Sequence, residues 1–183
     1  MNLVDEIKQC RLCEVELPLG PNPVFIFNPS SPFLIVGQAP GLKVHQTNKT
    51  WNDASGDRLR EWLNISSEKF YDSNLFSIVP MGFCYPGRGK SGDLPPRKEC
   101  AIRWMDTILS EFTNLKRIIL VGSYSTHYFL GEGSLTSYIN EYASNDSIFV
   151  VLPHPSPRNN IWLKKNEWFE KEALQSIRKK LSI

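Results

Sequence analysis

Residues 149–160 read Phe-Val-Val-Leu-Pro-His-Pro-Ser-Pro-Arg-Asn-Asn, and the rest of the sequence is best interpreted from this stretch. The run 148–152 is apolar and β-branched, which predicts a buried strand. Prolines then take every second position, where none can donate a ladder hydrogen bond and each favours extended backbone before it. We therefore predict that the strand ends in a stiff loop that carries His154 and Arg158, because functional side chains concentrate in such loops. The alternative is a proline-rich surface turn with an incidental histidine.

The composition is that of an ordinary globular domain. The chain has 183 residues, 22% of them charged, and a formal net charge of +2 at pH 7. This length is enough for one substantial core, and the charge alone does not indicate nucleic acid. No apolar run has the length of a membrane span, and the first residues lack the basic and apolar blocks of a signal peptide. We expect a single domain over residues 1–183, a cytoplasmic location, no membrane partner and a monomer.

The four cysteines form two pairs. Cys10 and Cys13 make a Cys-x2-Cys motif, whereas Cys84 and Cys100 are widely spaced. Disulfides are rare in cytoplasmic proteins, which leaves three interpretations: unrelated thiols, a four-cysteine zinc site, or a four-cysteine iron–sulfur cluster. The wide second pair favours a cluster over zinc, because zinc sites more often use two tight pairs. The spacing alone does not decide the metal.

Short apolar runs alternate with segments of helical spacing. Strands are predicted at Phe33–Val36, Leu75–Val79, Arg117–Val121 and 148–152, and helices at 3–13, Arg58–Leu63, Arg97–Asn114, 123–130 and Trp162–Leu181. Segments 14–32 and 42–56 are expected to be loops, and Ser55-Gly56-Asp57 is expected to cap the helix that follows. This alternation predicts an α/β fold, a single-domain three-layer α/β/α sandwich with a central, mostly parallel four-stranded sheet.

Each predicted strand ends in a turn or loop rich in glycine or proline. The four are Gly37-Gln38-Ala39-Pro40-Gly41, Pro80-Met81-Gly82, Gly122-Ser123 and the loop that holds His154. Ligands of parallel α/β sheets bind beyond the carboxyl ends of the strands. The sequence therefore predicts one cleft between these loops. Trp51, in the loop 42–56, is either a core side chain or an exposed face for stacking.

The first and last of these loops resemble the two signature motifs of the uracil-DNA glycosylase superfamily. The first, with Ala39 at its centre, is most similar to the iron–sulfur group (family 4), in which Gly-Glu-Ala-Pro-Gly is typical. The second, His154 to Asn159, is most similar to the single-strand-selective monofunctional group. All four cysteines fall where the iron–sulfur group has its cluster ligands, and the resemblance spans residues 3–180.

This resemblance implies a DNA-repair glycosylase that flips uracil or another deaminated base out of DNA and hydrolyses its N-glycosidic bond. His154 would stabilise the departing base, Gln38 would position water and base, and Trp51 would stack on the base. Asp53 is a candidate for water activation, although a loop or cap role is simpler. The remaining substrate-contacting residues would be Gly37, Ala39, Pro40, Gly41, Pro80, Met81, Ser156, Arg158 and Asn159.

The implied cofactor is a structural 4Fe-4S cluster held by Cys10, Cys13, Cys84 and Cys100, and the implied partner is DNA that contains a deaminated base. Arg158 would enter the space that the base vacates. Basic side chains near the cluster would face the DNA, and these are Arg88, Lys90 and Arg97.

Two positions depart from the family pattern. Gln38 stands where the iron–sulfur group has a glutamate, so a carboxylate that would orient water is missing. Pro80 stands, by register from Cys84, where members usually read uracil with an asparagine. The base that is cut is therefore open, with hypoxanthine and xanthine as candidates. The alternative function is a non-catalytic or weakly active protein that binds damaged DNA, and electron transfer by the cluster alone comes third.

Overall fold

The structure is a computed structural model that describes residues 2–182. Its centre is a four-stranded sheet in the order β2-β1-β5-β6, in which every neighbouring pair is parallel. The strands are β1 (Phe33–Val36), β2 (Phe76–Ile78), β5 (Arg117–Val121) and β6 (Phe149–Leu152). The predicted α/β class and its central parallel sheet are confirmed.

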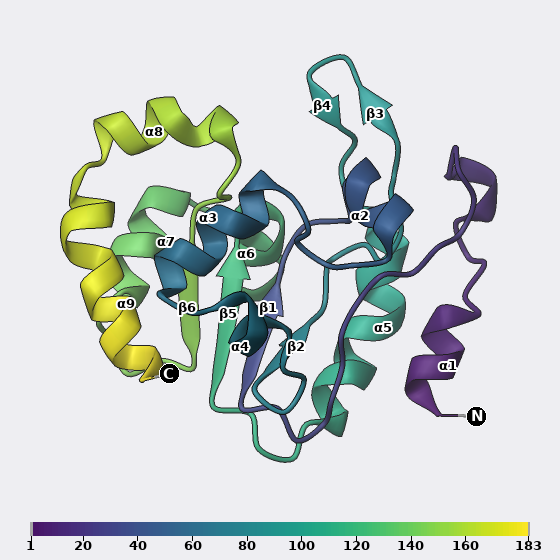
Figure 1. Cartoon of the computed structure of the whole chain (residues 1–183), viewed down its shortest axis with the longest axis horizontal. Coiled ribbons are helices and arrows are strands. Elements are labelled where there is room, and N and C mark those ends of the chain that lie inside the picture. Colours follow the sequence, from purple (N-terminus) through teal and green to yellow (C-terminus); the bar gives the residue numbers. More distant parts are fainter. Residues whose placement is uncertain (1, 183) are drawn as a thin grey trace.

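Helices cover both faces of this sheet (Figure 1). In that view α3 (Ala54–Leu63) and α4 (Ser67–Tyr71) lie in front of the strands, and α6 (Ser123–Leu130) and α7 (Leu135–Tyr142) lie behind them. The helices α5 (Lys98–Glu111) and α9 (Leu174–Leu181) flank its two sides. No helix in residues 2–182 combines the length and the apolar character that crossing a bilayer requires.

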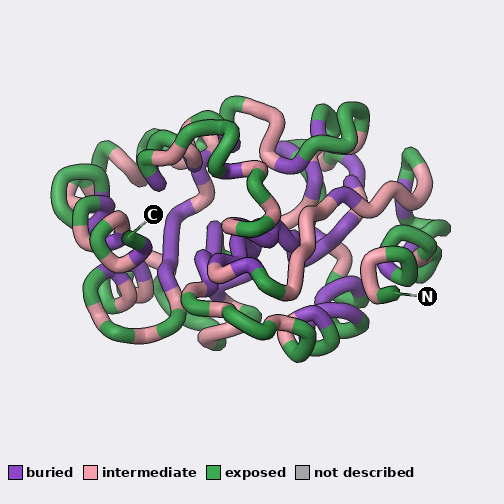
Figure 2. The backbone as a smooth tube through the Cα atoms, turned by 60° about the horizontal axis from the view of Figure 1, so that its bottom comes forward, coloured by how far each residue is buried: buried purple, intermediate pink, exposed green. Residues whose placement is uncertain are grey.

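The strands are buried on both faces, which explains why their sequences, apart from Ser77 in β2 and Arg117 at the start of β5, are apolar runs without alternation. Every residue of β1 and β2 is buried, and Figure 2 shows these central segments in purple beneath an exposed outer layer. The chain leaves β1 toward β2 but leaves β5 toward β6, in the opposite direction across the sheet. Open α/β sheets bind ligands at such a switch point, beyond the carboxyl ends of the two central strands.

Several predicted helix boundaries were wrong. The helix predicted at 3–13 is α1 (Leu3–Lys8), followed by a 3-10 turn at Glu14–Glu16. The predicted loop 42–56 contains α2 (Leu42–Thr47) and the start of α3, whose N-cap is Asp53 rather than residues 55–57. The predicted final helix is divided into α8 (Asn160–Lys165), a π-helical turn (Phe169–Ala173) and α9. The Asn166 amide donates to the Trp162 carbonyl at 2.9 Å, and such a side chain competes with the helical backbone.

The hairpin of β3 (Arg88–Gly89) and β4 (Gly92–Asp93) was expected to be a loop, and α4 and α7 were not predicted. Both helices are short, so their apolar periodicity covers little more than one or two turns. The hairpin strands have two residues each, too few to show alternation. In Figure 1 the hairpin projects from the end of the molecule that holds the carboxyl ends of the strands.

Candidate active site

A cavity of about 380 Å³ lies at the carboxyl ends of the strands. The segments after all four strands line it, through Gln38 after β1, Pro80 after β2, Tyr124 after β5 and His154 after β6. The predicted convergence of strand ends on one site is therefore observed. All the residues that the sequence nominated for catalysis or substrate contact line this cavity except Met81; they are Gly37, Gln38, Ala39, Pro40, Gly41, Trp51, Asp53, Pro80, His154, Ser156, Arg158 and Asn159.

Met81 supports the site through its backbone. Its side chain is buried, and its N–H donates to the Gly37 carbonyl at 2.9 Å. The Gly82 N–H donates to the Gln38 carbonyl, also at 2.9 Å. These bonds continue the β1–β2 ladder beyond the strands and hold the first loop rigid. Among the described residues, the Gln38 side chain has no hydrogen-bond partner, so its amide is available to a ligand.

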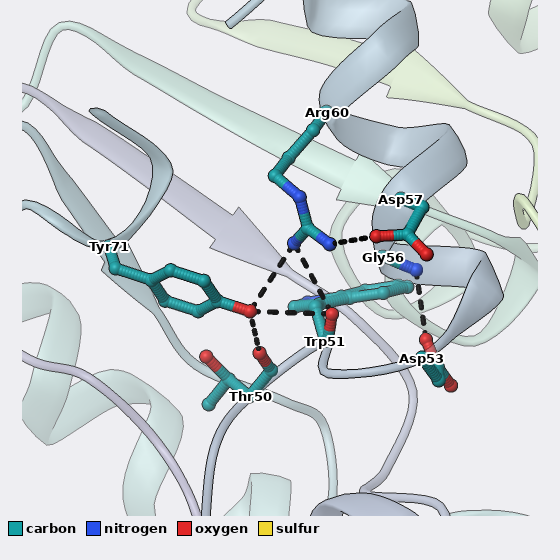
Figure 3. A network of polar contacts seen from close by, with 7 residues as sticks. All are labelled: Thr50, Trp51, Asp53, Gly56, Asp57, Arg60 and Tyr71. Atoms are coloured by element: carbon teal, nitrogen blue, oxygen red, sulfur yellow. Dashed lines mark hydrogen bonds and ion pairs between the residues drawn. The ribbon is translucent and has the colours of Figure 1, made fainter. Parts of the chain in front are cut away.

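The backbone of Trp51 is held in an unusual conformation. Its φ is +52°, in the left-handed region that non-glycine residues rarely adopt. Its carbonyl accepts hydrogen bonds from the Arg60 guanidinium at 3.3 Å and the Tyr71 hydroxyl at 3.4 Å (Figure 3). That hydroxyl also bonds the Thr50 carbonyl at 2.7 Å. Such strain persists only where the surroundings fix it, and it concentrates at functional sites.

Two glycines make room for Trp51. A Cβ on Gly56 would lie 1.7 Å from the Trp51 carbonyl oxygen, and a Cβ on Gly37 would lie 2.8 Å from the indole Cζ2. The indole therefore packs on the backbone of the first loop. It is half-buried, lines the cavity, and its ring centroid is 5.7 Å from that of His154, with 34° between the planes. Of the two interpretations of Trp51, the geometry favours a face that a ligand can reach.

His154 is neutral and its tautomer is fixed. The Ser156 N–H donates to Nδ1 at 3.2 Å, so the ring proton is on Nε2. Burial lowers the pKa of His154 to about 4; Asp53 opposes this shift and Arg158 adds to it. The Asn159 amide donates to the His154 carbonyl at 2.7 Å, which fixes the loop. At neutral pH the imidazole can therefore donate a hydrogen bond from Nε2 without carrying a charge.

Gly122 allows the His154 loop to approach β5 closely. Its φ is +88°, and a Cβ at this position would lie 3.3 Å from the Cβ of His154. Both the backbone conformation and the close approach require glycine.

Asp53 has a structural role as well as a place in the cavity wall. Its Oδ1 accepts the Gly56 N–H at 2.8 Å and caps α3. The simpler of the two predicted roles, a cap, is therefore observed. Its charge also acts on His154, whose pKa it raises against the larger effect of burial.

Arg158 is exposed and reaches the hairpin. A Cβ on Gly92 would lie 1.6 Å from the Arg158 Nη1, so the guanidinium packs directly on that glycine. Asp93 and Leu94 follow Gly92 and line the cavity. The hairpin is therefore one wall of the site. This wall was not predicted, because the two turn residues, Lys90 and Ser91, are not one of the glycine-containing pairs typical of two-residue hairpin turns.

Several other residues of the cavity wall were also not predicted. They are Val24, Val44, Thr50, Ser55, Ile78 and Tyr124. Apart from Tyr124, which directly follows Gly122-Ser123, no local pattern distinguishes them, because their place in the wall depends on how distant segments pack.

The predicted basic surface is only partly formed. Arg88 and Lys90 are exposed on the hairpin. Arg97, which was grouped with them, instead forms ion pairs with Glu99 at 2.8 Å and Glu16 at 3.6 Å and lies beside the cysteines.

The four cysteines lie around one small pocket, and all are free thiols. Within residues 2–182, no three histidine, cysteine or acidic side chains are arranged to hold a metal ion. A single tetrahedral zinc needs all its sulfurs about 2.3 Å from one centre. The thiolates of an iron–sulfur cluster bind different iron atoms and stand further apart.

A positively charged side chain, Arg97, lies at the cysteine pocket, and an anionic metal–sulfur group would need such a partner. Among the residues that the structure describes, the buried Nε of Arg97 has no hydrogen-bond partner, and Arg97 lines the pocket. Burial raises the pKa of Cys100 to about 12 and also raises the pKa values of Cys13 and Cys84. Without a metal these thiols are therefore protonated at neutral pH, and metal binding would displace the protons.

The fold and the site define an α/β protein with a rigid ligand cavity at the carboxyl ends of a parallel sheet. Residues 24–178 match the family model of the Uracil DNA glycosylase superfamily. The match includes the sheet, every residue of the cavity wall, Cys84 and Cys100, whereas Cys10 and Cys13 precede it. The chain belongs to the uracil DNA glycosylase superfamily, whose members are DNA glycosylases.

Proposed function

We propose that this protein is a DNA glycosylase that hydrolyses the N-glycosidic bond of uracil or another deaminated base. The observation that carries this proposal is the pair formed by Trp51 and His154. The two rings lie 5.7 Å apart on the wall of one cavity, and one offers an aromatic face while the other offers a neutral N–H donor. A flipped base needs both groups, a surface to stack on and a partner for its carbonyl oxygen.

His154 supplies stabilisation that develops only in the transition state. As the bond from the sugar C1′ to the base nitrogen breaks, its electron pair moves into the base and charge gathers on a carbonyl oxygen. The Nε2–H of His154 donates to this oxygen. Because the pKa of His154 is about 4, the imidazole is neutral at physiological pH and acts as a hydrogen-bond donor rather than as a cation.

The first loop holds the reacting groups in place. Gln38 positions water and base with its free amide, and the backbone of residues 37–41 approaches the ligand because it is pinned by the Met81 and Gly82 N–H groups. Ser156 and Asn159 support the opposite side of the cavity, where they hold His154. Such pre-ordering of polar groups is the main source of catalysis in sites of this kind.

The choice of base rests on an apolar wall. Pro80 is buried at the end of β2 and lines the cavity with Val24, Val44 and Ile78, none of which offers a side-chain hydrogen bond. A wall that offers no side-chain hydrogen bond does not reject other bases strongly. We therefore expect hypoxanthine or xanthine to be released as well as uracil.

Exposed cations would hold the DNA. Arg158 lies at the mouth of the cavity and enters the space that the flipped base leaves. Arg88 and Lys90 on the hairpin contact phosphates, which orient the DNA without reading its sequence.

We also propose a structural 4Fe-4S cluster held by Cys10, Cys13, Cys84 and Cys100. The cluster would cross-link the segment around α1 to the start of α5, and the buried Nε–H of Arg97 would face its negative charge. Protein purified anaerobically should be brown and contain iron at four atoms per chain, as the formula requires. Colourless protein that holds zinc alone would refute the cluster.

The activity is tested with oligonucleotides that contain uracil, hypoxanthine or xanthine, by measuring the free base and the abasic site. We expect release by the wild-type protein and a loss of about 100- to 1000-fold in His154→Asn. His127→Asn is the matched control, because His127 lies on α6, does not line the cavity and bonds the Gly133 carbonyl. Equal rates in wild-type protein and His154→Asn would remove His154 from the mechanism.

The second candidate is a protein that binds damaged DNA without cutting it. The replacement of the family's glutamate by Gln38 and of its asparagine by Pro80 favours this function. It predicts tighter binding of damaged or abasic DNA than of intact DNA, with no free base released from any oligonucleotide.

A further inference from the structure

The first motif of this chain lacks a carboxylate, because Gln38 stands where the resembled group has a glutamate. Hydrolysis still requires that the attacking water lose a proton. Two carboxylates line the cavity, Asp53 and Asp93. They come from different segments and have different surroundings.

Asp53 is already engaged. Its Oδ1 accepts the Gly56 N–H at 2.8 Å and caps α3. A cap bond of this kind directs the carboxylate toward the helix. One of its two oxygens is therefore taken by the helix and is not free for a water in the cavity.

Asp93 is not engaged in this way. Among residues 2–182, no hydrogen bond or ion pair of the Asp93 side chain is present, so both of its oxygens can accept. Its Oδ2 lies 3.3 Å from the position that a Cβ on Gly41 would occupy. Gly41 belongs to the same loop as Gln38, so the carboxylate lies against the loop from which the family's glutamate is missing.

The hairpin fixes the position of Asp93. Asp93 of β4 lies opposite Arg88 of β3 in the backbone register of the hairpin, and the Leu94 N–H donates to the Gly87 carbonyl at 2.8 Å. The neighbouring Gly92 is covered by the guanidinium of Arg158, which comes from the His154 loop. The hairpin thus connects the first loop to the last one across the cavity.

We propose that Asp93 is the general base that activates the attacking water, an inference that rests on the proposed function. The water oxygen bonds to C1′, one of its protons passes to an Asp93 oxygen, and the bond from C1′ to the base nitrogen breaks. The electron pair of that bond leaves with the base, whose carbonyl oxygen accepts the His154 Nε2–H. Solvent then takes the proton from Asp93 and protonates the free base.

The test is single-turnover base release by Asp93→Asn, with DNA affinity measured by fluorescence anisotropy. We expect release to be about 100-fold slower or more, with DNA binding unchanged or tighter, because a negative charge has been removed. Asp106→Asn is the matched control, since Asp106 is an exposed acid on α5 that does not line the cavity. Its rate should equal that of the wild-type protein.

A second variant separates chemistry from structure. Asp93→Ala removes the carboxylate. Added formate should restore part of the base release by this variant, because formate can occupy the space of the missing carboxylate and accept the proton of the water. If the role of Asp93 were purely structural, formate would restore nothing. Asp53→Asn keeps an N-cap side chain and should lose less activity than Asp93→Asn.

Three results would overturn the inference alone: an Asp93→Asn variant as fast as wild type, a loss explained entirely by weaker DNA binding, or a larger loss in Asp53→Asn. A wild-type protein that releases no base overturns the proposed function and this inference with it.

Discussion

The cavity and the cysteine pocket are each assembled from segments far apart in the chain, but different structures support them. The cavity wall rises from four neighbouring strands of one sheet, and residues of β1, β5 and β6 beneath it are fully buried. The cysteine pocket joins the end of α1, the loop after β2 and the first turn of α5. Strand ends are brought together by the folding of the sheet itself, whereas the cysteine segments meet through loops.

The cavity and the cysteine pocket also differ in the contacts that hold them in place without a ligand. Hydrogen bonds from Met81, Gly82, Ser156 and Asn159 fix the loops of the cavity. Around the cysteines the N-terminal segment is anchored by a few buried side chains, such as Ile7 and Leu17. The cavity is thus set by the fold, whereas at the cysteine pocket the proposed cluster would add stabilisation.

Loss of the proposed cluster should have the largest effect and should separate the two regions. Because structural metals contribute about 10 kcal/mol or more in small domains, Cys13→Ser should raise amide exchange in α1 by about 100-fold or more. Exchange in the cavity loops should stay nearly constant. Val15→Ser is the control, since Val15 is 96% exposed in the same segment. An equal rise of amide exchange in α1 and in the cavity loops would contradict this difference between the two regions.

Removal of the stacking face should have the next largest effect, and only on the cavity. Stacking of a base on an aromatic ring is worth about 1–3 kcal/mol, so Trp51→Ala should lower kcat/KM for base release by about 10- to 100-fold. Trp51→Phe keeps an aromatic face and should retain most of the activity. Full activity in Trp51→Ala would show that the base does not stack there.

Acid should lower the free energy of unfolding through His154. In the unfolded chain the imidazole has a pKa of about 6.5, and in the native protein burial lowers this pKa to about 4. Above pH 6.5 both states are neutral, but as the pH falls toward about 4 the unfolded chain binds a proton that the native protein does not. Between about pH 7 and about pH 5 this removes about 2 kcal/mol from the free energy of unfolding.

This contribution is measured by urea unfolding of wild-type protein and His154→Asn at both pH values. The variant lacks the imidazole, so its loss of stability on acidification should be smaller by about 2 kcal/mol. An identical loss in both proteins would mean that His154 does not titrate as its burial indicates.

The smallest expected effect concerns the wall formed by α3. Asp53→Ala removes the N-cap and should lower the free energy of unfolding by about 1 kcal/mol, whereas Asp53→Asn keeps a capping side chain and should change it little. Thermal unfolding of the two variants distinguishes them. Equal stability of both would show that the cap bond to Gly56 contributes nothing.

Strands and strand ends could be predicted because their signal is local. A strand covered on both faces is a short continuous apolar run, and β5 was predicted with its exact bounds, Arg117–Val121. The loops that follow the strands contain glycine, proline and histidine, and these residue types can be recognised in the sequence itself. The nominated residues of these loops accordingly line the cavity, with Met81 as the exception because its side chain turns into the core.

The sequence by itself determined the parallel α/β sheet, the loops at its carboxyl edge and the resemblance to a family, since each depends on residues adjacent in the chain. Only the tertiary structure decided that Arg97 turns to the cysteines, that Trp51 lies on Gly37 beside His154, and that Asp93 reaches the first loop. The physical reason is that these contacts join segments tens of residues apart. Their geometry depends on crossovers and on the absence of a Cβ at particular glycines, which no local pattern records.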